Sequence, residues 1–313
     1  MEDITPDLQQ LLDSIPDLDE YKKLLDDLLE LNLEGLTYKE IKAVYGKHVR
    51  FIPQTVMVVS EKDFNSTLFY RVRKHTIAPI KENMTTKRAY SYPFPQYCKE
   101  NGRLNIKNKP VFYCSDYAFP TMLECKLGKE ERGFLGIWKP NVNTPVHIAC
   151  FLSKMIQRNN AMYQTIENFR KSVYESTNAG RHKKPQLELL NNFLFDQFVY
   201  EKPPYSITSY LSHEILFNNM VKEVTVEGII YPSIESSLRY CNYAFHPFFS
   251  DRFLELQKVI EFTLNIDKEL LKGDYTMGRI GVPINGTIVW KIPSKKEAKS
   301  FYNLIHQGFI NDK

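Results

Sequence analysis

The fold is decided by a stretch of about sixty residues that begins with Leu68-Phe69-Tyr70-Arg71-Val72-Arg73. Aromatic and β-branched residues predict a strand here, and its end carries two arginines. A second strand is predicted at Pro110-Val111-Phe112-Tyr113-Cys114-Ser115, and an apolar run from residue 118 then ends at the carboxylate of Glu124. Between the two strands, the dipeptide Asn101-Gly102 predicts a turn that presents Arg103. Polar side chains so widely spread act on one ligand only if the fold brings them together.

A later segment adds a hydroxyl to this polar set. Gly228-Ile229-Ile230-Tyr231-Pro232-Ser233 predicts a strand that leads into a turn at the serine. Ser233 follows Glu124 by 109 positions. Apolar residues at helical spacing over 146–176 predict helices in that interval.

Taken together, these segments resemble the RES domain, a family named for its Arg, Glu and Ser. The resemblance rests on order and spacing, since Arg103 precedes Tyr113 by ten residues and Tyr113 precedes Glu124 by eleven. It covers roughly residues 66–250 and departs from the family pattern in the long interval before Ser233 and in Leu104, where the family usually has Trp. The residues that carry it are Tyr70-Arg71, Gly102-Arg103-x-Asn105, Val111-Phe112-Tyr113-x-Ser115, Ala118 with Glu124, and 228–233 followed by Asn242 and Phe245.

The resemblance implies an α+β fold similar to that of ADP-ribosyltransferases. On this basis we divide the chain into an acidic helical N-terminal segment (1–60), a RES-like catalytic core (61–250) with a helical insertion near 130–200, and C-terminal helices and a hairpin packed on the core (251–313). Within the last part, 251–271 is predicted to be a helix, Asn285-Gly286 a hairpin turn, and Ser294-x-x-Glu297 the cap of a final helix.

The chemistry that the family implies is cleavage of NAD between nicotinamide and ribose. Arginine suits the pyrophosphate because its planar guanidinium forms paired, charged hydrogen bonds to phosphate oxygens. A carboxylate suits the ribose carbon, where positive charge develops as nicotinamide leaves. We therefore assign Arg103, Glu124 and Ser233 as catalytic residues. The residues expected to bind NAD are Arg71, Tyr113, Arg73, Asn105 and Asn242.

Each assignment has a structural alternative. Arg71 and Arg73 can be surface charges, Glu124 an ion-pair partner, and Ser233 the start of a turn. Likewise, the loop from Met84 to Tyr97 either lies over a ligand or covers the edge of the core.

The function expected from the resemblance is NAD degradation, with inorganic phosphate or water attacking the ribose carbon. Many family members are toxins of bacterial toxin–antitoxin pairs and are held inactive by a helix-turn-helix antitoxin. The resemblance therefore implies that this protein contacts nucleic acid only indirectly, through such an antitoxin. An alternative within the enzyme class is protein ADP-ribosylation by NAD. A more distant alternative is a non-catalytic nucleic-acid-binding or regulatory protein.

Charge and composition are compatible with an anionic ligand. Residues 1–40 hold twelve Asp and Glu against three Lys, a net charge of −9, which leaves the rest of the chain at +13. Five cysteines without paired spacing, and histidines without metal-ligand spacing, predict neither a disulfide framework nor a metal site. The N-terminus has no signal-peptide pattern and no apolar run approaches the length of a membrane span, so we expect a cytoplasmic protein.

Overall fold

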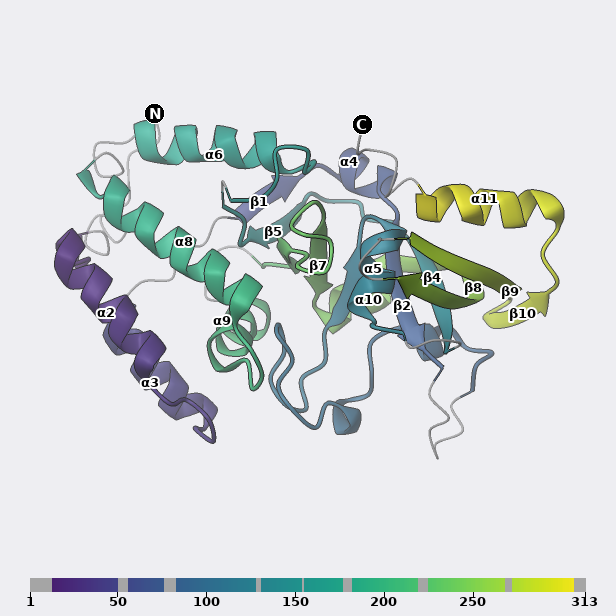
Figure 1. Ribbon diagram of the computed structural model, residues 1–313, viewed down its shortest axis with the longest axis horizontal. Helices are drawn as coiled ribbons and strands as arrows, with labels where there is room; N and C mark the ends of the chain where they lie inside the picture. The colour runs from purple at the N-terminus through teal and green to yellow at the C-terminus, as the bar shows by residue number, and fades with distance from the viewer. Residues whose placement is uncertain are drawn as a thin grey trace. The chain divides into compact units, whose positions relative to one another are not determined.

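The computed structural model describes residues 13–49, 56–75, 83–127, 131–153, 155–176, 182–218, 225–267 and 272–306. The chain is α+β, which confirms the predicted class, and its described residues form ten strands (Figure 1). They divide into two compact units that interleave along the sequence. Unit 1 comprises Met1–Met57, Phe94–Pro110 and Ala149–Pro232, and unit 2 comprises Val58–Pro93, Val111–Ile148 and Ser233–Lys313.

Unit 1 is mainly helical. Helices α2 (Leu18–Glu30) and α3 (Tyr38–His48) pack together and against α8 (Lys184–Tyr200) and α9 (Ser206–Phe217), while α6 (Tyr163–Ser176) precedes α8 along the chain (Figure 1). The predicted capping box at the start of α3 is confirmed, because Thr37 accepts from the Glu40 amide and the Glu40 carboxylate accepts from the Thr37 amide. Strand β6 (Gly228–Pro232) belongs to unit 1, and strands β1 (Val56–Val59) and β5 (Val146–Cys150) each have residues assigned to both units.

Unit 2 is built on a run of seven antiparallel strands. Their order is β7-β3-β2-β4-β8-β9-β10. The bounds are β2 Phe69–Lys74, β3 Phe112–Ser115, β4 Arg132–Pro140, β7 Cys241–Phe245, β8 Leu254–Asp267, β9 Lys272–Ile284 and β10 Thr287–Lys291. Helices α4 (Glu61–Ser66), α5 (Ala118–Glu124), α10 (Pro247–Phe253) and α11 (Lys295–His306) complete the unit, with the 3₁₀ segment η1 (Lys87–Tyr90).

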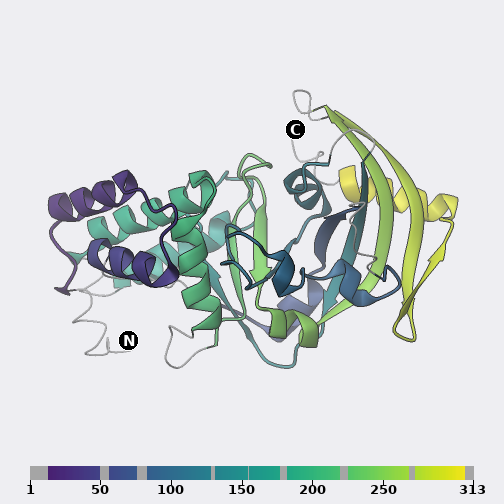
Figure 2. The ribbon, with the colours of Figure 1, turned by 90° about the horizontal axis from the view of Figure 1, so that it is seen from below.

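One face of this sheet carries the apolar core of unit 2. Helices α5 and α11 pack on it (Figure 2). Phe301 and Ile305 of α11 belong to the same buried cluster as Ile260 and Phe262 of β8. Tyr70 and Val72 of β2 belong to the same cluster. Because side chains alternate along a strand, Arg71 and Arg73 extend from the opposite face of β2.

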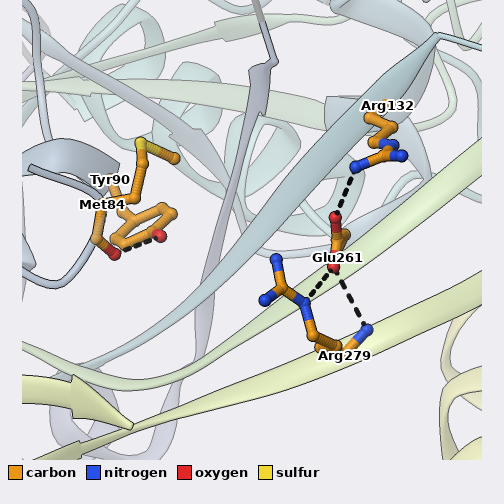
Figure 3. A network of polar contacts seen from close by, with 5 residues as sticks. All are labelled: Met84, Tyr90, Arg132, Glu261 and Arg279. Atoms are coloured by element: carbon orange, nitrogen blue, oxygen red, sulfur yellow. Dashed lines mark hydrogen bonds and ion pairs between the residues drawn. The ribbon is translucent and has the colours of Figure 1, made fainter. Parts of the chain in front are cut away.

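The opposite face is covered by the segment from residue 83 to 93. Tyr90 is buried between Phe134 of β4 and Trp290 of β10, with ring centroids 5.8 and 6.4 Å away, and its hydroxyl donates to the Met84 carbonyl at 2.8 Å (Figure 3). Ile288 donates its amide to the Thr85 carbonyl at 2.7 Å. This part of the loop therefore packs as a second layer on the sheet.

A charged triad joins three strands on that same face. Glu261 of β8 is buried, and its two oxygens accept from Arg279 of β9 at 2.8 Å and from Arg132 of β4 at 3.5 Å (Figure 3). Burial alone would raise the pKa of Glu261, but the hydrogen bond and charge of Arg279, aided by Arg132, lower it overall. The guanidinium of Arg279 also lies 5.0 Å from the Trp290 ring. The triad thus holds β4, β8 and β9 in register.

One helical prediction is wrong, and another is met only in part. Residues 251–267 hold the end of α10 and then strand β8, because Leu254, Leu256, Ile260 and Phe262 alternate with more polar residues at the two-residue period of a strand, while 268–271 lie outside the described residues. Near 130–200, where a helical insertion is predicted, the described residues begin with strands β4 and β5 and continue with helices α6 and α8. A glycine suits position 136 of β4 because a Cβ atom at this position would lie 2.7 Å from the Trp138 side chain.

The C-terminal hairpin and helix cap are confirmed. Asn285 and Gly286 join β9 to β10 with φ angles of 48° and 78°, the left-handed values that a two-residue turn requires. At the start of α11, the Ser294 hydroxyl accepts from the Glu297 amide and the Glu297 carboxylate accepts from the Ser294 amide.

Candidate functional site

Three predicted site residues from distant parts of the chain converge in unit 2. The Oε1 atom of Glu124 accepts a hydrogen bond from the Ser233 hydroxyl at 2.8 Å and another from the Asn242 side-chain amide at 2.9 Å. Ser233 and Asn242 are 0% and 5% exposed, whereas Glu124 is exposed. A solvent-facing carboxylate is therefore fixed by two buried donors, and we call these three residues the Glu124 triad.

The position of Glu124 is unusual for a carboxylate. It is the last residue of α5, where the helix dipole places partial negative charge and disfavours an acidic side chain. The two donors offset this cost by solvating one oxygen. No hydrogen bond from the described residues reaches Oε2. One oxygen thus orients the group while the other is available to a ligand.

A tight turn fixes the Ser233 side chain. The Ser233 amide donates to the Tyr240 carbonyl at 2.9 Å, and the Ser233 carbonyl accepts from the Leu238 amide and the Ser236 hydroxyl. The Ser236 hydroxyl in turn accepts from the Tyr240 amide at 3.2 Å. Ser237 and Leu238 adopt positive φ angles, so this turn has a defined, demanding conformation.

Asn242 is fixed by the sheet. It pairs in register with Ser115 of β3, and the Ser115 hydroxyl donates to the Cys241 carbonyl at 2.6 Å. Ser115 is fully buried. Strands β3 and β7 therefore hold the amide that orients Glu124.

Tyr113 lies on the same face of β3 as Ser115, because the two residues are separated by one position. It pairs in register with Ala244 of β7 and is partly exposed. Its side chain thus extends from the sheet on the face that carries Asn242.

The arginines of β2 donate to backbone carbonyls. Arg71 donates from Nε to Ser91 at 3.2 Å and from a terminal nitrogen to Tyr113 at 2.8 Å, and it lies 5.5 Å from the Phe112 ring. Arg73 donates to the Ala89 carbonyl. Burial lowers the pKa of Arg71, although nearby groups partly oppose this. Both side chains fasten the segment 83–93 to the sheet.

Arg103 and Asn105 belong to unit 1. They lie in the predicted tight turn, where Gly102 and Asn105 exchange backbone hydrogen bonds of 2.9 and 3.3 Å. Arg103 donates to the Phe198 carbonyl at 2.6 Å and lies 4.9 Å from the Tyr205 ring. It thus satisfies a carbonyl in the last turn of α8, where a cation is also favoured by the helix dipole.

Sequence reasoning did not single out Asp116, which follows β3 directly. Burial raises the pKa of its carboxyl to about 6, despite long hydrogen bonds from the Ser115 and Tyr243 hydroxyls of 3.4 and 3.5 Å. The only sequence signal was its place after the strand that carries Tyr113 and Ser115. A buried carboxyl group with a raised pKa thus lies one residue from Ser115, the strand partner of Asn242.

We predict that Asp116→Asn stabilises the protein in a pH-dependent way. The raised pKa means that the neutral carboxyl favours the folded state below about pH 4, and that this contribution is lost as the pH rises through 6. The variant should therefore match the unmodified protein at pH 4 and exceed its unfolding free energy by up to roughly 3 kcal/mol at pH 8. Urea unfolding at both pH values, with Asp27→Asn on α2 as the control, measures this. An equal difference at both pH values would contradict the prediction.

The described ranges lack both a metal-binding cluster and a membrane-spanning helix. No group of three or more His, Cys, Asp or Glu side chains is placed there to hold a metal ion. None of the helices in those ranges combines the length and apolarity needed to cross a membrane. All five cysteines are free thiols.

Comparison with known proteins adds no relative. Neither models of protein families nor curated protein sequences give a match to this chain.

Proposed function

We propose that this protein cleaves NAD between nicotinamide and ribose, using Glu124 to stabilise the positive charge that develops on the ribose carbon. The observation that carries the proposal is the Glu124 triad, in which an exposed carboxylate is held by two buried donors from segments more than one hundred residues away. Preorganised charge of this kind stabilises a transition state without reorganisation during the reaction. The three residues are also ones that the RES resemblance singles out.

The reaction is written as a substitution at the ribose carbon. The bond from this carbon to the nicotinamide nitrogen breaks, its electron pair stays on the nitrogen, and nicotinamide leaves neutral. An oxygen of inorganic phosphate then bonds to the carbon to give ADP-ribose 1″-phosphate, or water does so to give ADP-ribose and a proton. Oε2 of Glu124 faces the cationic carbon, while Ser233 and Asn242 keep Oε1 in place.

Arg71 is proposed to bind the pyrophosphate through N–H groups that it does not donate to backbone carbonyls. A guanidinium has five N–H groups, and Arg71 uses Nε and one terminal nitrogen on the carbonyls of Ser91 and Tyr113. Arg73 is a further candidate for the same task. Tyr113 is proposed to contact a ring of NAD.

The proposed core is of the ADP-ribosyltransferase-like RES type. Strands β2 and β3 pair only at Tyr70 and Ser115, whereas β2 pairs with β4 over six residues. The sheet therefore begins to separate between β2 and β3, and this separation supports the proposed core type. In the cell, such an activity would deplete cytoplasmic NAD and require restraint, for which we propose a helix-turn-helix antitoxin as partner.

Product analysis tests the proposal and identifies the acceptor. Purified protein is incubated with NAD in phosphate buffer and in phosphate-free buffer, and products are resolved by ³¹P and ¹H NMR. A sugar-phosphate product seen only with phosphate would establish a phosphorylase, and ADP-ribose in both buffers a hydrolase. Intact NAD in both buffers would contradict the proposed function.

A further inference from the structure

An aromatic pair adjoins the Glu124 triad in unit 2. The rings of Tyr117 and Tyr240 lie with centroids 4.7 Å apart at an interplanar angle of 47°. Tyr240 is buried and Tyr117 is partly exposed. The Tyr240 carbonyl accepts the Ser233 amide at 2.9 Å, so the pair is attached to the same turn that fixes the triad serine. We call Tyr117 and Tyr240 the tyrosine pair.

Strand register places this pair on the face that carries Asn242. Strands β3 and β7 pair antiparallel through Tyr113 with Ala244 and Ser115 with Asn242. Two residues further along each segment, the same register leads to Tyr117 opposite Tyr240, as their ring contact bears out. Both tyrosines lie two residues beyond Ser115 and Asn242, just outside the ends of β3 and β7, and Tyr113 lies two residues from Ser115 in the other direction.

Two carboxyl groups lie close to the tyrosine pair, which also has Arg239 as a chain neighbour. Glu124 is bonded to Asn242 on one side, and Asp116 is the chain neighbour of Tyr117 on the other. Burial, and then the charge of Asp116, raises the pKa of Tyr117. Lys126, close to Glu124 in sequence, is paired with Glu235 at 2.9 Å. Carboxylates and aromatic faces both attract a planar cation and repel a phosphate.

We propose that Tyr117, supported by Tyr240, binds the planar cationic ring that departs in the reaction. This assignment rests on the proposed function, in which the nicotinamide of NAD is a pyridinium cation until its bond to ribose breaks. An aromatic face attracts the cationic ring more strongly than the neutral product. Tyr117 is therefore a residue that binds the substrate, and its weaker attraction for the neutral ring favours release of nicotinamide.

Steady-state kinetics of NAD cleavage test the assignment. Tyr117→Ala should raise KM roughly tenfold and raise kcat by up to a similar factor, so that kcat/KM changes little, because the cation–π attraction is present in the substrate complex and fades as the ring becomes neutral. Tyr117→Phe keeps the aromatic face and should restore KM to within about threefold. Tyr302→Ala, a partly exposed tyrosine on α11 that packs on Tyr275, serves as the matched control. A drop in kcat at unchanged KM for Tyr117→Ala would overturn the assignment.

An equilibrium measurement separates this assignment from the proposed function. Binding of the 1-methylnicotinamide cation and of ADP-ribose is followed by NMR titration of the unmodified full chain and of Tyr117→Ala. We expect Tyr117→Ala to weaken the cation about tenfold and to leave ADP-ribose unchanged. Such a loss in a protein that does not consume NAD would support the cation subsite and reject the reaction. Turnover with equal binding of the cation by both proteins would reject the subsite and leave the reaction standing.

Discussion

Glu124→Gln is expected to lower the turnover of NAD by at least about a thousandfold, which corresponds to roughly 4 kcal/mol of transition-state stabilisation. Glutamine has the shape of glutamate, and its carbonyl oxygen still accepts from Ser233 and Asn242 at the positions that Oε1 occupies. The variant therefore keeps the hydrogen bonds and loses only the negative charge. Since that charge is what stabilises the ribose cation, kcat should fall while KM changes little.

Two controls make the result specific to this carboxylate. The unfolding free energy of Glu124→Gln in urea should stay within about 1 kcal/mol of the unmodified protein, since Glu124 is exposed and its hydrogen bonds persist. Glu131→Gln removes a half-exposed carboxylate of the same unit that is paired with Lys74, and should leave turnover unchanged. Retention of more than a tenth of the activity in Glu124→Gln would show that this carboxylate does not carry the chemistry.

Arg71→Met is expected to lower the unfolding free energy by about 3–5 kcal/mol. The substitution removes two charged hydrogen bonds, to the carbonyls of Ser91 and Tyr113, and leaves both acceptors without this donor. Bonds to charged groups contribute about 1.5–3 kcal/mol each. Urea unfolding followed by tryptophan fluorescence measures the change, with Arg252→Met at an exposed position of α10 as the control.

A conservative variant separates geometry from charge at this position. Arg71→Lys keeps the charge but replaces a planar group with several donors by a single ammonium, so it should recover less than half of the lost stability. The segment 83–93 should also become more sensitive to proteolysis in both variants, because Arg71 and Arg73 fasten it to the sheet. A loss below 1 kcal/mol in Arg71→Met would show that these contacts do not stabilise the fold.

Local chemistry made several elements predictable from the sequence. The turn at Asn285-Gly286 and the helix caps at Thr37 and Ser294 depend only on residues within a few positions, and each is found as predicted. The strands β2 and β3 are likewise found where aromatic and β-branched residues cluster. Strand β8 was missed because its apolar residues satisfy both helical and strand spacing over a short window, and only pairing with β4 and β9 decides between them.

In the candidate site, too, the sequence indicated individual residues, whereas the contacts between them depend on the tertiary fold. The resemblance singled out Glu124, Ser233 and Asn242, but their hydrogen bonds depend on a helix, a turn and a strand that meet only in the folded unit 2. The use of Arg71, Arg73 and Arg103 on backbone carbonyls was not visible from residue types, because arginine suits a carbonyl as well as a phosphate. Tyr117 and Tyr240 are 123 positions apart, and their contact follows from the register of β3 and β7.

The most direct test of the central claim is a time course of nicotinamide release from NAD by the purified full chain in phosphate buffer. The proposed role of Glu124 predicts steady release in proportion to protein concentration, with one nicotinamide formed for each NAD consumed. Release no faster than in a protein-free blank, under conditions in which the protein is folded by circular dichroism, would contradict it.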